Sequence, residues 1–380
     1  MRVYANNGAT SFPKAPGSSV AMATLLDTMP ANINRGSYSA AYDVGMDVLK
    51  TRQLLCQLFD FDQPKNVVFT SGATHSLNVI LKGFLRPNDH VIISSMEHNG
   101  LMRPLHNLAK SGVQYDIAFT NNEGELAPQD VVKLIKPNTK MVVMTHASNV
   151  CGTLLPVEKI GKICKEHGIK FVLDTAQTAG SIPINMQHID ALCFTAHKCL
   201  LASPGLGGFL IKGDFAKLVN PIITGGTGSS SHELDHPSSM PDKFEAGTLN
   251  IPAIIGLKTA LEYILSFKQG ELSDIKMSLT SEFLRQLEGI KGFRVVGKRN
   301  VAERVAVVSL DFIDRDNSDV STILDEKFGI MTRCGLHCSP MSHKTLGTYP
   351  QGTVRFSFSH FNTMEEVDYI VRSIKWILNN

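Results

Sequence analysis

The first 250 residues alternate short apolar runs with segments of helical periodicity. Helical patterns cover residues 73–84, 101–111 and 156–167, and the last begins with a proline, which is tolerated in a first helical turn. Short apolar runs between such segments are typical of strands in a sheet that helices cover on both faces. Seven runs have this character: residues 66–70, 90–94, 114–119, 141–145, 170–174, 191–195 and 207–211. The pattern therefore predicts an α/β fold built on one seven-stranded, mainly parallel sheet.

The pattern changes after residue 250, where long helical stretches come first and strands follow. The predicted elements are helices over 253–267 and 272–287, strands over 304–310 and 353–357, and a final helix from Met364. This order indicates a smaller α+β domain at the C-terminal end. We predict a large α/β domain over residues 15–250 and a small domain made of residues 1–14 and 251–380. A polar, glycine- and serine-rich loop at 225–237 lies close to the join and is long enough to be functional.

Composition limits the partners and the compartment. The formal net charge is +2, 43% of residues are hydrophobic and 19% are charged. With no basic tract, neither nucleic acid nor an acidic membrane is indicated as a partner. The N-terminus has no apolar signal region, and no run approaches the about 18 apolar residues that a membrane span requires. Seven cysteines, an odd number and mostly within apolar runs, favour reduced thiols and a cytoplasmic location.

An acidic residue and a lysine follow two neighbouring predicted strands. Asp174 ends the run 170–174, and Lys198 stands just past the run 191–195. The carboxyl ends of such strands meet at one edge of the sheet, where ligands of open α/β folds bind. This pairing suits pyridoxal phosphate (PLP), which needs an amine for a Schiff base and a carboxylate beside its pyridine nitrogen. The alternative is a surface lysine and a helix-capping aspartate.

A phosphate site is predicted where residues 67–74 pass from a strand through Gly72 into a helix. Free N–H groups and the positive end of the helix dipole favour a dianion there, and Thr74 adds a hydroxyl donor. An ordinary helix cap would look the same. A dinucleotide site is less favoured, because no G-x-G-x-x-G opens a helix after a strand and the glycines at 205–208 lead into a strand instead.

These residues resemble the class V, fold type I PLP enzymes, and among them the cysteine desulfurase and selenocysteine lyase branch with a short active-site loop. The resemblance runs from Tyr4 to Thr363. It rests on motifs in the family's order, namely residues 4–10, Asn34-Arg35-Gly36, 71–74, Met96-Glu97-His98, 148–153, 174–177, Ala196-His197-Lys198, 244–248, 333–338 and 361–363.

The resemblance implies a role for each matching residue. Lys198 would hold PLP as a Schiff base and move the α-proton of the substrate, and His98 would stack on the ring. The other ring contacts would come from Asp174 at the pyridine nitrogen, Gln177 at the ring oxygen, and Asn149 near that oxygen and the substrate. Phosphate would be bound by Ala73, Thr74, Thr195, His197 and, from the neighbouring subunit of a homodimer, Thr248.

For the substrate carboxylate the resemblance implies Arg355, which can form a bidentate pair, and Arg333 is a second candidate. Without the family match, His98 can be read as a histidine satisfied within its own loop, and Arg355 as a solvated strand arginine.

Cys338 decides which chemistry the cofactor serves. In the resembled branch this cysteine takes the sulfur of L-cysteine as a persulfide and leaves L-alanine. A free thiol with a pKa of about 8.5 is only slightly ionised at neutral pH, so a positive charge from His337 or Arg333 would be needed. The alternatives are a buried, inert thiol, a bystander in another PLP reaction, and a zinc site of Cys334, His337, Cys338 and His343, whose spacing matches no common finger.

Two departures from the family leave the substrate open: Cys334 replaces the usual threonine, and His75 stands where glutamate is common. Cys334 would either resolve a persulfide into a disulfide or pack against the loop. We predict a PLP-dependent cysteine desulfurase acting on L-cysteine, or on selenocysteine, with a sulfur-acceptor protein as a further partner and no metal. The alternatives are a class V aminotransferase or another PLP lyase without a catalytic thiol, a PLP-binding, non-catalytic partner of a sulfur-transfer complex and, last, a nucleotide-binding protein.

Overall fold

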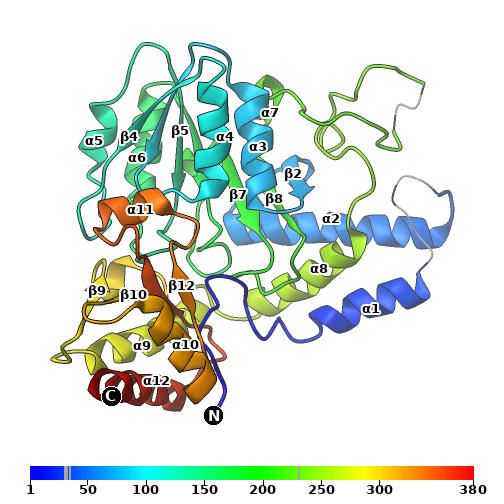
Figure 1. The fold of residues 1–380 in the computed structure, drawn as a ribbon. Coiled ribbons are helices and arrows are strands. Elements are labelled where there is room, and N and C mark those ends of the chain that lie inside the picture. The colour runs from blue at the N-terminus through cyan, green and yellow to red at the C-terminus, as the bar shows by residue number, and fades with distance from the viewer. Residues whose placement is uncertain (30–32, 34–35, 230–231) are drawn as a thin grey trace.

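The computed structural model describes residues 1–29, 33, 36–229 and 232–380 (Figure 1). Asn34 and Arg35 of the family motif, and Ser230 and Ser231 of the polar loop, lie outside the described residues. No helix in the described part of the chain combines the length and apolar character needed to cross a bilayer.

The large sheet has seven strands, and five neighbouring strands pair in parallel. β8 is antiparallel to both of its neighbours, so β2 points the same way as those five strands and β8 alone is reversed among the seven strands of this sheet. In spatial order the strands are β2 (Val67–Thr70), β8 (Gly207–Ile211), β7 (Ala191–Thr195), β6 (Lys170–Asp174), β5 (Thr139–Thr145), β3 (His90–Ser94) and β4 (Gln114–Ala118). The predicted fold class is confirmed.

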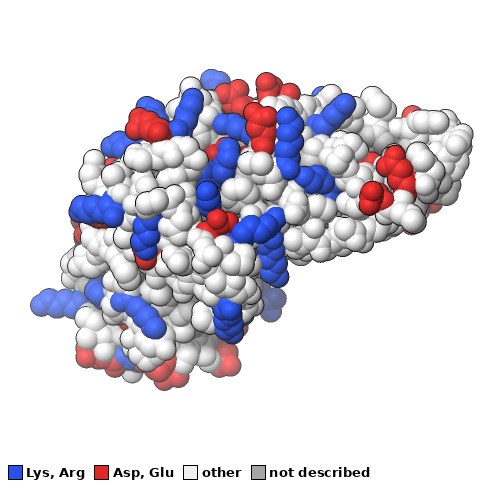
Figure 2. All heavy atoms as spheres, turned by 90° about the horizontal axis from the view of Figure 1, so that it is seen from above, with Lys and Arg blue, Asp and Glu red and all other residues white. Residues whose placement is uncertain are grey.

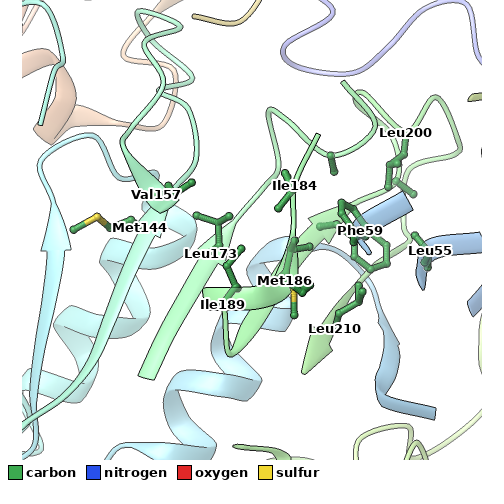
Figure 3. Close-up of a cluster of buried hydrophobic side chains, with 14 of the residues drawn as sticks. Leu55, Phe59, Met144, Val157, Leu173, Ile184, Met186, Ile189, Leu200 and Leu210 are labelled. Atoms are coloured by element: carbon green, nitrogen blue, oxygen red, sulfur yellow. The ribbon is translucent and has the colours of Figure 1, made fainter. Parts of the chain in front are cut away.

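Helices cover both faces of this sheet, as near-continuous apolar strands require. One face carries α3 (Ala73–Phe84), α4 (Asn99–Ala109) and α7 (Gly213–Leu218). The other carries α2 (Ser39–Phe59), α5 (Pro128–Val132), α6 (Val157–Glu166) and α8 (Ile251–Leu265). Figure 3 shows side chains from this second core, in which Phe59 of α2 lies near Leu55 and Leu210.

A second, smaller sheet has four antiparallel strands and lies apart from the large sheet (Figure 1). Its strands in order are β12 (Arg333–Gly335), β13 (Thr353–Ser357), β10 (Val307–Phe312) and β9 (Phe293–Val296). The helices of this part are α9 (Glu271–Gln286), α10 (Asn317–Phe328), α11 (Pro340–Thr345) and α12 (Met364–Asn379), and short 3-10 turns lie at Pro64–Asn66, Met186–His188 and Val301–Glu303. A separate apolar core lies between the sheet and its helices.

The N-terminal segment joins the two sheets. β1 (Val3–Tyr4) pairs with β11 (Ile330–Met331), so Val3 and Ala5 belong to the core of the smaller sheet. The chain then crosses to the large sheet, where Ser11 N–H donates to the His197 carbonyl at 2.8 Å. The predicted boundary at residue 250 stays a prediction. α8, which follows it, packs against α2 and against α1 (Ser18–Thr28).

α1 and α2 form an arm that the sequence does not predict. Both expose large apolar side chains, Val20 and Leu26 on α1 and Tyr42 and Met46 on α2, each 64–69% exposed. Apolar residues on the outer face blur the 3.6-residue period that marks an amphipathic helix. Figure 2 shows that most charged groups gather over the main body while the outer end of the arm is mostly uncharged.

Candidate active site

A cavity of about 340 Å³ lies at the carboxyl ends of β6 and β7, where it meets residues of the smaller sheet. This is the edge at which open α/β sheets bind ligands. Nearly all predicted site residues line it: Ala73, Thr74, His98, Asn149, Asp174, Gln177, Thr195, His197, Lys198, Arg333 and Arg355. Residues far apart in the sequence therefore meet, while Cys338 and Thr248 lie outside the lining.

Lys198 and Asp174 both line the cavity. The carboxylate Oδ1 of Asp174 accepts a hydrogen bond from Ala176 N–H at 2.9 Å, which leaves Oδ2 without a partner among the described residues. Burial lowers the pKa of Lys198 to about 8, against the opposing effect of Asp174. Burial also raises the pKa of Asp174. An amine whose proton leaves near neutral pH is suited to Schiff-base formation and proton transfer.

The opposite end of the cavity has donors for a phosphate. Gly72, with φ of 151°, turns the chain from β2 into α3 and presents the first N–H groups of that helix. Burial, together with Lys198 and Lys14, lowers the pKa of His197 to about 4, so its ring is neutral. Its Nδ1 is buried and has no hydrogen-bond partner in the described structure. Such an orphaned atom fits a site completed by a ligand.

His98 caps α4, and its Nδ1 accepts from Gly100 N–H at 2.9 Å. Burial and the nearby Lys198 and Arg333 lower its pKa to about 4, which leaves a neutral ring for stacking. The hydrogen bond that His98 makes within its own loop uses only one ring nitrogen. It is therefore compatible with stacking of the ring on a cofactor.

Glu97 is a buried residue whose part in the site the sequence analysis did not identify. Its two carboxylate oxygens accept from Thr145 N–H at 3.1 and 3.0 Å, and Ser94 Oγ also donates to it. It thus ties β3 to β5 beneath the cavity. Burial raises its pKa to about 8. In the sequence, the only indication that Glu97 belongs to the site is its position next to His98.

Arg355 is fully buried in β13, which excludes the reading as a solvated strand arginine. Its guanidinium donates to the Asn149 carbonyl at 2.9 Å and to Asn6 Oδ1 at 3.3 Å, and in the described structure no carboxylate pairs with it. Burial and the neighbouring Arg333 lower its pKa to about 9. A buried guanidinium with unused donors at a cavity wall is a site for a carboxylate.

Cys338 is exposed on the loop after β12, and the Arg333 guanidinium lies 3.2 Å from its sulfur. Consecutive left-handed residues, His337 with φ of 50° and Cys338 with φ of 60°, turn the thiol outward. A non-glycine residue rarely adopts this conformation, so the surrounding contacts must hold it. The reading of Cys338 as a buried, inert thiol is excluded.

The structure corrects the candidate role of His337 as a source of positive charge. His337 is buried, and its Nε2 pairs with Thr353 Oγ1 at 2.9 Å. Burial and Arg355 hold its pKa well below the usual value, so the ring is neutral. Of the two cations considered, only Arg333 contacts the thiol.

Cys334 occupies the middle of β12, so its side chain points to the face opposite that of Arg333. Burial and Asp316 raise its pKa. The structure therefore favours the alternative in which Cys334 packs against the loop over the one in which it converts a persulfide into a disulfide. Among the described residues, no group of three or more His, Cys, Asp or Glu side chains lies close enough together to hold a metal ion, so the zinc alternative has no support.

Asn149 holds the Cys338 loop, a contact that the sequence analysis did not predict. Its Nδ2 donates to the His337 carbonyl at 2.8 Å, and its Oδ1 accepts from Ser339 Oγ at 2.7 Å. The loop is also joined to α4, because Asn99 N–H donates to the Cys338 carbonyl at 2.8 Å. Gln177, predicted to bind the ring oxygen, donates from Nε2 to the Gly8 carbonyl at 3.1 Å.

Thr248 lies in an exposed loop outside the cavity. The neighbouring Glu245 anchors this loop through a buried ion pair of 2.7 Å with Arg52 of α2. The predicted contact of Thr248 with the phosphate of another subunit stays a prediction.

Comparisons with known proteins agree with this geometry. Residues 3–370 match the family model described as aminotransferase class-V. Probable cysteine desulfurases from Pyrococcus abyssi and Borreliella burgdorferi are 30% and 29% identical, over 96% and 99% of this chain and 92% of each of those proteins. The apo structure of a cysteine desulfurase from Thermococcus onnurineus is similar with a TM-score of 0.91 and 31% identity, covering 100% of this chain and 95% of that one. The structure of the Escherichia coli cysteine desulfurase CsdA has a TM-score of 0.88 and 26% identity at the same coverage.

Proposed function

The chain belongs to the aminotransferase class-V family, and from that premise we propose that it is a PLP-dependent cysteine desulfurase. It would convert L-cysteine to L-alanine and keep the sulfur as a persulfide on Cys338. The observation that carries the proposal is the contact of Arg333 with the exposed thiol of Cys338 on a loop fastened to the wall of the Lys198 cavity.

The residues present fit PLP. Lys198 offers an amine without a hydrogen-bond or ion-pair partner in the described structure, and Asp174 offers a buried carboxylate oxygen. Gly72 and the orphaned Nδ1 of His197 line the same cavity, where the phosphate would lie. When bound, PLP supplies an electron sink that stabilises negative charge on the substrate carbons.

Each of the remaining steps of the reaction is assigned to a side chain of the site. Arg355 binds the substrate carboxylate and fixes its orientation, and the neutral amine of Lys198 removes the α-proton and returns one later. Arg333 stabilises the thiolate of Cys338, which attacks the substrate sulfur. An S–S bond forms on Cys338 as the Cβ–S bond of the substrate breaks, and the carbon skeleton takes up a proton and leaves as alanine.

The exposure of Cys338 supports transfer of the sulfur to a further protein, because an exposed persulfide can be reached by an acceptor thiol. All seven cysteines are free, which supports a reducing, cytoplasmic location.

A homodimer is supported by the exposed apolar side chains of α1 and α2, among them Val20, Leu26 and Tyr42. The position of Thr248, exposed and outside the cavity of its own subunit, agrees with a contact to a second subunit. Sedimentation at micromolar concentration should give the mass of two chains.

The test is to purify the protein with PLP, record its absorbance spectrum, and measure alanine and sulfide formed from L-cysteine and selenocysteine. Cys338→Ser should keep the yellow colour but lose at least about 10²-fold in alanine formation, because the nucleophile is gone. Cys334→Ser is the matched control and should retain activity, since its side chain lies on the other face of β12.

Full activity in Cys338→Ser would refute the desulfurase assignment. Formation of a keto acid without release of sulfur would indicate an aminotransferase instead. A yellow protein that turns over no amino acid would indicate a non-catalytic partner.

A further inference from the structure

A second cavity, of about 40 Å³, adjoins the active site behind Lys198. The two cavities share Gly8, Gln177 and Lys198 in their linings. α9 and the segment that follows β13 contribute to the lining of the second one. Since a water molecule needs about 10–15 Å³ of such space, it has room for a few waters or one small ion but not for an amino acid.

Lys276 of α9 lines this second cavity and is 8% exposed. Its Nζ donates to Ser181 Oγ at 2.5 Å, and in the described structure it has no carboxylate within ion-pair distance. The half-buried Lys170, by contrast, has Asp190 at 3.1 Å. Among the described residues, no Asp or Glu lines this cavity. Besides Lys276, its ionisable groups are Lys198, Cys199 and His360.

An ammonium group in such a place lacks compensation. Burying a charge without a partner is costly, so the group either loses its proton or acquires a counter-ion. Burial lowers the pKa of Lys276, while Cys199 opposes that shift. Ser181 and Ser359 also line the cavity, and their hydroxyls, which only accept hydrogen bonds in the described structure, can turn their hydrogens toward an anion.

We propose that Lys276 and the surrounding serines bind one small monovalent anion, of the size of chloride or hydrosulfide. The size of the cavity excludes larger anions such as nucleotides. A wider groove shares Gly180, Ser181 and Leu272 with the cavity and offers a route from solvent. A bound anion would lie in a cavity that shares Lys198 with the active site, and the site does not depend on the reaction that Lys198 serves.

The first test is the Tm of the PLP-loaded protein in sodium chloride against sodium gluconate at equal ionic strength, because gluconate is too large for the cavity. Chloride should raise the Tm of the native protein by about 1–2 °C. Lys276→Met should lose this difference. Lys268→Met, which removes an exposed lysine at the rim of the groove, should keep it.

The second test does not depend on a variant that must fold. Crystals of the native protein soaked in sodium bromide should show an anomalous peak beside Lys276 Nζ. Either the absence of that peak or an unchanged chloride response in Lys276→Met would overturn the proposal, and a neutral, anion-free lysine would then be the correct description.

Discussion

The two ends of the proposed reaction are built differently. Asp174 and Lys198 follow adjacent parallel strands and face a buried cavity. Cys338 is itself exposed, but it stands between the buried residues His337 and Ser339 on a loop whose carbonyls at His337 and Cys338 accept hydrogen bonds from Asn149 and Asn99. A sheet edge fixes several groups around one cavity, whereas a loop can present a single side chain to solvent. The comparison shows that the cavity groups are fixed by the sheet, while the thiol is fixed by loop contacts and faces outward.

The largest effect is expected at the rigid end. Lys198→Ala removes the only amine in the active-site lining of the described structure, so the Schiff-base absorbance should vanish and alanine formation should fall by at least about 10³-fold. Absorbance spectra and alanine assays on the same preparation check both. Lys217→Ala, whose side chain is 79% exposed, is the control. If Lys198→Ala still became yellow with PLP and still converted cysteine, the role of Lys198 on which the comparison rests would be wrong.

An intermediate effect is expected where the loop is attached. Ser339→Ala removes the hydrogen bond to Asn149 Oδ1 without touching the cavity lining. Because a buried hydrogen bond contributes about 0.5–1.5 kcal/mol, kcat for alanine formation should fall about 3- to 10-fold. The absorbance spectrum and the KM for L-cysteine should stay unchanged. Asn138→Ala, at a half-buried site just before the start of β5, serves as control. A changed spectrum in Ser339→Ala would show that the loop and the cofactor end are not independent.

The smallest effect concerns the charge beside the thiol. Burial keeps the pKa of His337 far below 6.5, so that residue is neutral and gains no proton as pH falls from 8 to 6. Arg333 instead places its guanidinium against the thiol. The rate of Cys338 alkylation by iodoacetamide at pH 7 should therefore drop about 3-fold in Arg333→Gln and stay unchanged in His337→Gln.

These rates are measured in Cys334→Ser, so that the half-buried thiol of β12 does not contribute to the alkylation. An inflection near pH 6.5 in the alkylation rate of Cys338 that disappears in His337→Gln would show that His337 supplies the positive charge beside the thiol.

The fold was largely predictable because the large sheet is made of local patterns. The runs that became β6 and β7 are apolar and short, and their ends are marked by Asp174 and Lys198 in the sequence itself. α1 and α2 were not predictable in this way, because residues such as Val20 and Tyr42 are apolar on the exposed face. Helix periodicity is informative only where the outer face is polar.

The candidate site was predictable in its residue types but not in its contacts. Asn149 reaches a carbonyl 188 positions away, and no sequence period signals such a pair. His337 looks like a cation from its type alone, and only burial beside Thr353 shows that it is neutral. Residue type limits the chemistry, while surroundings that come from distant segments decide the charge state.

The N-terminal segment has a consequence for how the protein is made. A Cβ added at Gly8 would lie 3.3 Å from the Arg355 guanidinium, and Asn7 N–H donates to the Ser357 carbonyl. The ribosome makes residues 6–11 long before it makes β13, so these residues have no partners until β13 has been synthesised. One wall of the cavity is completed only then, so the site cannot reach its final geometry earlier.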